Sequence, residues 1–135
     1  MSVRANVDKA NLVAQIQAME QRFRDAIRPA SYAGALVYYS EVKMHVPRDS
    51  GLLADSIYMV HSEDNSTPGM RETYHVSWNK KKAPHGHLLE FGTSRMAARP
   101  FLRPAYEAAK GRAQAEIMKT FREHMDGSAD HRGNQ

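Results

Sequence analysis

The chain has 135 residues, enough for one domain that buries about two-thirds of the surface of its unfolded chain. Its 41% hydrophobic and 25% charged residues are typical of a globular protein, and the absence of cysteine excludes disulfides and thiolate metal sites. The net charge of +4 tolerates nucleic acid nearby but does not indicate that base sequence is read.

No uninterrupted apolar run approaches the ~20 residues that a helix needs to cross a bilayer. The N-terminal sequence also lacks the continuous apolar block of a secretory signal. We therefore expect no membrane partner and a protein that is made and used in a cytoplasm. Residues 1–125 are expected to form a single domain. Residues 126–135 contain no apolar side chain larger than alanine and are expected to be a disordered tail.

The N-terminal third predicts two helices. From Asp8 to Ile27, apolar residues recur at steps of three and four, which places them on one helical face, and Asp8 is a suitable N-cap. Pro29 cannot continue the hydrogen bonding of a helix, so a break or kink is expected near Arg28.

A second helix is expected from about Ala30 to His45. Its apolar residues, Leu36 and Tyr39 among them, cover most of its circumference. Such a helix needs cover on more than one side. A central place in the domain core and a neighbouring subunit are equally good sources of that cover.

The middle of the chain predicts a turn followed by a β-hairpin. Pro47 to Gly51 is the turn, in which Gly51 can take a positive φ. Residues 52–62 and 72–79 alternate between polar and apolar side chains and should form antiparallel strands joined by a polar loop. Because two strands alone are marginally stable, they require further pairing or packing on the helices.

The segment His87–Ala105, HLLEFGTSRMAARPFLRPA, organises the rest of the chain. It predicts a short buried segment, a stop at Gly92, and a polar link that ends in Pro100 and Pro104. A last helix follows, with apolar residues on one stripe as far as Met125 and Gly127 just beyond its end.

Glu90 is the charge of most interest, because the residues around it are apolar. A carboxylate in such a place should find a cationic partner or backbone donors. Our hypothesis is a pairing with Arg99 or Arg103 that fixes the position of the link, within or between subunits. The alternative is a side chain that points to solvent from a half-buried segment.

Catalytic chemistry finds little support. His75, His85 and His87 could join Glu90 as metal ligands, but two histidines in a Gly/Pro loop have low specificity and are more often solvated. There is no phosphate-binding Gly-rich loop and no nucleophile elbow. We therefore expect no enzyme activity, no metal and no cofactor.

A run of three lysines follows the second predicted strand. Lys80, Lys81 and Lys82 could face a phosphate backbone. As an uninterrupted run at the end of a strand, they are more often a solvated turn that discourages edge pairing. The sequence leaves both alternatives open.

Two separated motifs together resemble a phage family. The first is PRDSGLLADSI from Pro47 to Ile57, and the second is LEFGT from Leu89 to Thr93 with ARPFLRPA from Ala98 to Ala105. Their pairing, in this order and at this spacing, is similar to the gene-product-ten-like neck and tail-completion family of long-tailed double-stranded DNA phages. The departures are Ser50, where the family commonly has Thr, and the loop His85–His87.

The resemblance implies a structural role at the head–tail junction of a virion assembled in the host cytoplasm. Copies would form a ring, expected to be a hexamer, through which DNA passes without base-specific contact. Neighbouring neck, head-closure, tail-terminator or tail-tube proteins would be partners. The lumen would be lined by Lys80, Lys81 and Lys82. The subunit and partner interface would use Leu89, Glu90, Phe91, Gly92, Thr93, Arg99, Pro100, Phe101 and Arg103, together with Leu36 and Tyr39.

The fold expected is α+β, with an antiparallel sheet packed against N-terminal helices and a long C-terminal helix. Within the same class, a tail terminator that caps the tail tube is the nearest alternative. From another class, the alternative is a small metal-dependent nuclease that uses the three histidines and Glu90. A DNA-binding regulator lacks a recognition-helix signal.

Overall fold

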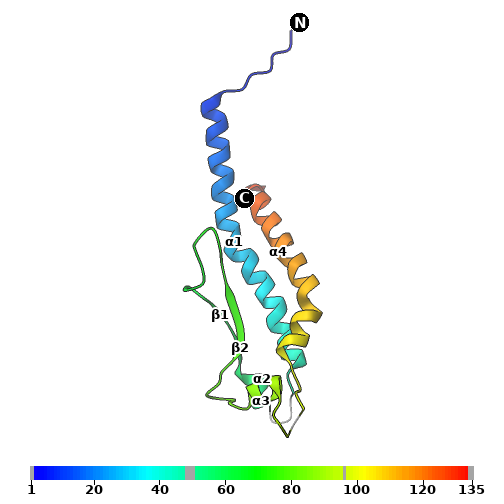
Figure 1. Cartoon of the computed structure of the whole chain (residues 1–135). Coiled ribbons are helices and arrows are strands. Elements are labelled where there is room, and N and C mark those ends of the chain that lie inside the picture. Colours follow the sequence, from blue (N-terminus) through cyan, green and yellow to red (C-terminus); the bar gives the residue numbers. More distant parts are fainter. Residues whose placement is uncertain (1, 48–50, 96, 134–135) are drawn as a thin grey trace.

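A computed structural model of the chain describes residues 2–47, 51–95 and 97–133. In these ranges two long helices run antiparallel, and a two-stranded hairpin and two short helices complete the molecule (Figure 1). The predicted α+β class is confirmed, with an antiparallel sheet, N-terminal helical structure and a long C-terminal helix. The predicted turn residues Arg48, Asp49 and Ser50 lie outside the described residues.

The first helix, α1, is continuous from Lys9 to His45, so the prediction of two separate helices was wrong. Its axis changes direction where the colour passes from blue to cyan in Figure 1, as expected of a helix with Pro29 inside it. Ala26 and Ala30 flank the proline and are buried, so packing offsets the hydrogen bond that Pro29 cannot make. The predicted N-cap is confirmed, since Asp8 Oδ1 accepts from Ala10 N at 3.2 Å.

Gly51 takes the predicted positive φ, at 76°, and leads into a short helix, α2 (Leu52–Ser56), in place of the start of a strand. The strand prediction failed here because Leu53 and Ala54 are both buried. A strand would point consecutive side chains to opposite faces, whereas a helical turn can bury both.

The hairpin consists of β1 (Ile57–His61) and β2 (Tyr74–Trp78), paired antiparallel with Ile57 opposite Trp78. The predicted alternation is clear in β1, where residues 57, 59 and 61 are more buried than 58 and 60. In β2 it is partial, because His75 is exposed and Trp78 buried but Ser77 is as half-buried as Tyr74 and Val76. Both strands pack on α1, which supplies the support that two strands require.

A third short helix, α3 (Gly86–Phe91), precedes the long α4 (Leu102–Gly133). The predicted end at Gly127 was wrong, because α4 continues for six residues beyond it; the separate tail stays a prediction. Gly34 lets α1 approach α4 closely, since a Cβ there would lie 2.6 Å from Ile117 Cγ1.

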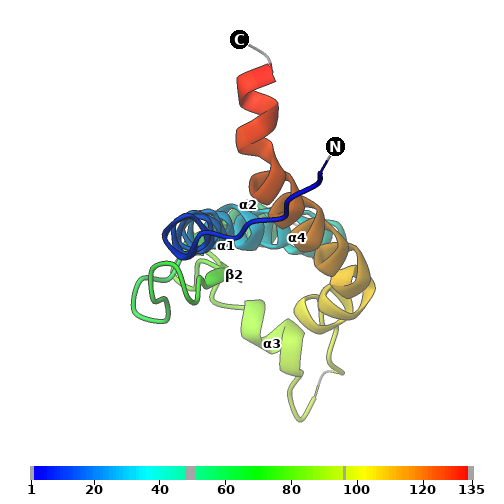
Figure 2. The same cartoon turned by 90° about the horizontal axis from the view of Figure 1, so that it is seen from above.

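The core lies at the lower end of the molecule in Figure 1, where α1, α2, the hairpin and the start of α4 meet. Its buried members are Val42, Val46, Leu53, Ala54, Ile57, Trp78, Ala83, Phe101 and Ala105. Figure 2 shows the hairpin and α3 on one side of the α1–α4 layer, while the last turns of α4 extend to the other side. The N-terminal part of α1 projects beyond this body (Figure 1).

Candidate functional site

The carboxylate of Glu90, in α3, caps the N-terminus of α4. Its Oε1 accepts hydrogen bonds from the backbone N–H groups of Phe101 (3.0 Å) and Leu102 (2.8 Å), and its Oε2 accepts a longer one from Arg103 (3.5 Å). Pro104 comes next and has no N–H group. A helix start normally leaves four N–H groups without partners, but here every donor of these four residues is satisfied. The negative charge also lies at the positive end of the helix dipole.

Backbone donors are thus the partners of Glu90 in these contacts, and Arg103 takes part through its main chain. A second bond, from Arg99 N to Leu89 O at 2.7 Å, ties the end of the link to α3. Gly92 starts the link with a φ of 74° and donates its N–H to Leu88 O. Backbone hydrogen bonds to α3 therefore fix both ends of the link between α3 and α4.

Phe101 belongs to the core and offers no surface to a partner, contrary to the prediction. Its side chain is 0% exposed and meets the Trp78 ring edge to face, with ring centroids 5.5 Å apart. Leu89 is half-buried against the same cluster. Gly86 allows this packing, because a Cβ there would lie 2.5 Å from Trp78 Nε1.

The other predicted residues of this segment reach the surface. Phe91 is 75% exposed, the largest exposure of an aromatic side chain among the described residues. Thr93, Arg99, Pro100 and Arg103 are also exposed. The link between α3 and α4, on or next to which they stand in the sequence, lies at the lower end of the molecule in Figure 1. We call the second family motif, Leu89–Thr93 with Ala98–Ala105, the signature. Some of its residues thus belong to the core and others to the surface.

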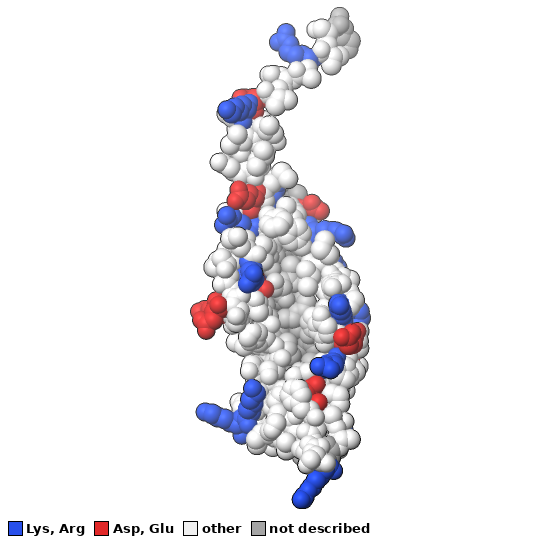
Figure 3. Space-filling view, viewed as in Figure 1, with Lys and Arg blue, Asp and Glu red and all other residues white. Residues whose placement is uncertain are grey.

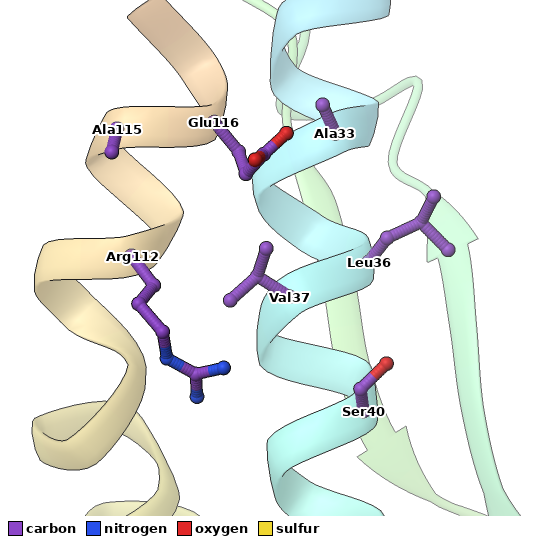
Figure 4. Close-up of a pocket in the computed structure, with 7 residues that line it drawn as sticks. All are labelled: Ala33, Leu36, Val37, Ser40, Arg112, Ala115 and Glu116. Atoms are coloured by element: carbon purple, nitrogen blue, oxygen red, sulfur yellow. The ribbon is translucent and has the colours of Figure 1, made fainter. Parts of the chain in front are cut away.

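On the side of the α1–α4 pair away from the hairpin, a groove of about 450 Å³ separates the two helices (Figure 4). We call this surface the back groove; its lining residues are Ala33, Leu36, Val37, Ser40, Arg112, Ala115 and Glu116. Leu36, one of the two predicted interface residues of this helix, is exposed here. The other, Tyr39, is half-buried against the core. Of the two sources of cover considered for this helix, the core therefore accounts for Tyr39 but not for Leu36.

An ion pair between the buried Glu41 and the largely exposed Arg112 crosses from α1 to α4 beside the back groove. Arg112 Nη2 donates to Glu41 Oε1, and His45 Nε2 lies 3.2 Å from Glu41 Oε2. Figure 4 shows the Arg112 side chain reaching from α4 toward α1. Glu41 is the one carboxylate in the stretch Ala30–Val46, but its partner lies 71 positions away, where no local pattern indicates it.

A second groove, of about 260 Å³, opens between α1, β2 and α4. We call it the tyrosine groove; its lining residues are Ala35, Tyr38, Val42, Tyr74, Val76, Leu102 and Tyr106. The rings of Tyr38 and Tyr106 stack with centroids 5.4 Å apart. Burial, aided by the neighbouring Tyr106 and Glu107, raises the pKa of Tyr38 above its ordinary value of 10.0. The middle of the body is free of charged atoms in Figure 3, and the charges gather along its two sides.

The projecting part of α1 carries large apolar side chains that the body does not cover. We call them the α1 stripe: Leu12, Val13, Ile16, Met19 and Phe23, each 42–54% exposed. The stripe joins the α1–α4 contact at its lower end, where Phe23 meets Phe121 edge to face at 4.9 Å. The three- and four-residue spacing predicts this helical face, but not that the face lies outside the core.

The lysine run forms an exposed turn after β2. Asn79 Oδ1 accepts from the backbone N–H groups of Lys81 (2.9 Å) and Lys82 (3.2 Å), and Lys80 Nζ lies 5.7 Å from the centre of the Trp78 ring. The turn is thus fixed at its backbone while its three side chains are exposed. In Figure 3, blue atoms gather at the lower left, where this loop runs in Figure 1.

The histidines do not converge. Among the side chains that the structure describes, no three of His, Asp or Glu come together as metal ligands. His87 Nδ1 contacts Pro84 O at 3.0 Å, and Glu90 is engaged by α4. A different histidine, His61, pairs with Glu72 at 2.7 Å and braces the base of the hairpin loop.

Residues 10–92 match the family model of the HK97-gp10-like proteins, described as "Bacteriophage HK97-gp10, putative tail-component". The match covers more than half of the chain and runs from the start of α1 to the end of α3. The chain belongs to this family. The match includes the first motif and the LEFG part of the second, while Ala98–Ala105 lies beyond it. No curated protein and no solved structure matches the chain.

Family membership makes the chain a phage tail-component protein, a structural protein associated with the virion. It also confirms the family predicted from the two motifs. In the part of the chain that the structure describes, no helix combines the length and the apolar character needed to cross a membrane.

Proposed function

We propose that this tail component acts at the head–tail junction, where copies of the chain form a ring, a hexamer in our expectation, through which DNA passes. The observation that carries the proposal is the pair of dissimilar uncovered surfaces: the back groove faces one side of the α1–α4 layer, and the tyrosine groove faces the other. A ring closes through head-to-tail contacts, which require two different complementary surfaces on each subunit.

The exposed part of the link supports the same assignment. Phe91 and the link residues Thr93, Arg99 and Pro100 form an end of the molecule that Glu90 holds in place. We propose that this end meets an adjacent neck, head-closure, tail-terminator or tail-tube protein. A surface that docks a partner benefits from such rigidity, because less conformational freedom is lost on binding.

Lys80, Lys81 and Lys82 are proposed to line the lumen. Their contacts with DNA would be nonspecific and salt-sensitive, because they would neutralise phosphates rather than read bases. Replacing all three with glutamine should reduce the slope of log affinity against log salt by about 2–3 for duplex DNA, since each lost phosphate contact removes roughly 0.9. A matched control replaces Lys110, Lys119 and Arg122 of α4 in the same way and should leave the slope nearly unchanged if the lumen assignment is right.

Imaging the particle tests the proposal directly. In a reconstruction of the virion, the α1–α4 helix pair should fit into ring density between the head and the tail tube. Density for the chain elsewhere in the tail would contradict the junction assignment. Loss of the gene distinguishes the junction role from that of a tail terminator. Without a joining protein, filled heads and finished tails should accumulate unjoined. Tails of abnormal length would instead favour a tail terminator.

A further inference from the structure

The hairpin has an unpaired edge whose position can be derived from two hydrogen bonds just outside the strands. Ser62 N donates to Thr73 O, and Asn79 N donates to Ser56 O, both at 2.8 Å. In an antiparallel ladder, directly opposed residues alternate between bonded and non-bonded pairs. These two bonded pairs fix the alternation along the whole hairpin, because the register between them is continuous.

It follows that the N–H and C=O groups of Tyr74, Val76 and Trp78 point away from β1. The sheet of the described residues contains β1 and β2 alone, and within those residues no hydrogen bond is made by the outward backbone groups of Tyr74 and Val76. An unpaired edge of this kind is a template for a further strand. The same two residues place their side chains in the tyrosine groove. A strand added at this edge would therefore find both backbone partners and an apolar surface.

The chain contains a segment with the matching properties. Residues 2–8, SVRANVD, precede α1 and have no helical structure. Val3, Ala5 and Val7 alternate with Arg4 and Asn6, which gives a strand with one apolar face and one polar face. Nothing in the described structure covers that apolar face, since Val3 is 94% and Val7 is 78% exposed.

This segment cannot reach the groove of its own chain. The groove begins at Ala35, which lies 27 residues after Asp8 and thus about 40 Å along α1, at ~1.5 Å per residue. Seven extended residues span at most about 24 Å. Figure 1 shows the segment leading away from the body, beyond the upper end of α1. An occupant of the groove with this sequence must come from a second copy.

We propose that residues 3–7 of one copy add to β2 of the next copy as a third strand, with Val3, Ala5 and Val7 over the tyrosine groove. The inference rests on the proposed ring and identifies one of its head-to-tail contacts. The inserted segment would also carry the α1 stripe of its own chain onto the neighbouring body. Backbone pairing supplies the attachment, and the alternating side chains fix which face is buried.

Cysteine cross-linking between full-length chains tests the insertion, because the natural sequence has no cysteine. Chains with Val3→Cys, Ala5→Cys or Val7→Cys are mixed with chains carrying Val76→Cys and oxidised gently. Paired strands place facing Cβ atoms within disulfide distance. We expect disulfide-linked heterodimers from at least one of these mixtures. Tyr106→Cys, in the α4 wall, gives a second groove position if Val76→Cys does not fold.

The matched controls use the opposite face of both strands. His75→Cys lies beside Val76 but points away from the groove, and Arg4→Cys or Asn6→Cys lies on the polar face of the segment. A third strand predicts that positions 4 and 6 link to 75, that positions 3, 5 and 7 link to 76, and that the mixed combinations link at least tenfold less. This dependence on parity would not arise from random collisions.

Sedimentation of the wild-type chain distinguishes a failure of the strand-insertion proposal from a failure of the ring proposal. Rings without parity-specific links would overturn the insertion and leave the ring proposal standing. Monomers without links would overturn the insertion as well, and the ring would then be judged by particle imaging alone. Links that ignore parity would show that the segment contacts the neighbour without joining its sheet, which also overturns the proposal.

Discussion

The two parts of α1 carry similar apolar spacing but have different surroundings. From Ala26 onward the helix lies against α4 and the hairpin, which bury Ala26, Ala30, Gly34, Ala35 and Val42 but leave Leu36 exposed. The N-terminal part of α1 projects beyond the body, and the α1 stripe is about half exposed down to Phe23, which meets Phe121 of α4. Helical periodicity thus specifies which face of a helix must be covered, but not which part of the molecule or assembly covers it. In the lower part the chain itself supplies most of the cover; in the upper part, under our proposal, another copy does.

The largest expected effect is a loss of stability in the core at the lower end of the molecule. Phe101→Ala should lower the free energy of unfolding by about 3–5 kcal/mol, because it removes a fully buried ring that packs against Trp78. Urea titration followed by tryptophan fluorescence measures the change. Phe91→Ala is the matched control in the same signature and should change stability by less than ~1 kcal/mol, since Phe91 is largely exposed. Equal losses for the two variants would contradict the division of the signature into core and surface.

The next effect concerns the cap that joins α3 to α4. Glu90→Ala should cost about 1–3 kcal/mol of stability, because three backbone donors at the start of α4 lose their acceptor. Glu90→Gln retains one acceptor oxygen and should cost less. Thermal unfolding monitored by circular dichroism reports both. Glu107→Ala, one turn farther along α4 and exposed, serves as the control. If Glu90→Ala changed assembly without changing the melting temperature, the capping role would be refuted.

A smaller effect is expected at the tyrosine groove and depends on pH. Because the folded-state pKa of Tyr38 is raised, the folded chain holds this proton more tightly than the unfolded chain does. Stability should therefore be unaffected by this group below about pH 10. It should fall as pH rises from the unfolded pKa of Tyr38 through the folded one. Tyr38→Phe should reduce the fall, while Tyr58→Phe, on the exposed face of β1, should not. A fall of the same size in Tyr38→Phe and the wild type would argue against the assignment.

The smallest effect on the monomer should come from the projecting helix. Ile16→Ser should change the free energy of unfolding by no more than ~0.5 kcal/mol, because the side chain is already half exposed. It should nevertheless weaken self-association in sedimentation if the α1 stripe is covered by another copy. Gln15→Ser makes a comparable change beside the stripe and should leave association intact. A large loss of monomer stability in Ile16→Ser would mean that the two parts of α1 do not differ as described.

Local chemistry made several features predictable. Gly51 and Gly92 take positive φ as their turn positions require, Asp8 caps α1, and the β1 alternation is visible in the sequence. The residues of α2 were misassigned because a five-residue helix is too short to show a period. The continuous helix through Pro29 was not predicted, because the sequence shows the lost hydrogen bond at the proline but not the tertiary packing that offsets it.

The candidate surfaces were less predictable than the elements that carry them. Leu36 and Phe91 were selected as interface residues and are exposed, whereas Phe101 was selected by the same reasoning and is buried. The Glu41–Arg112 pair and the tyrosine groove join residues from distant parts of the chain, so no local pattern announces them. The Lys80–Lys82 turn was located correctly, and its lumen role stays a prediction.

The sequence by itself determined the family, the helical and strand periodicities and the need of Glu90 for donors. These follow from side-chain chemistry and spacing within a few residues. Only the tertiary structure decided that the donors of Glu90 are the first N–H groups of α4, that Phe101 faces inward, and that the outer edge of β2 is unpaired beside an apolar groove. Each of these depends on which segments meet in space, and hydrophobic burial makes that choice over the whole chain at once.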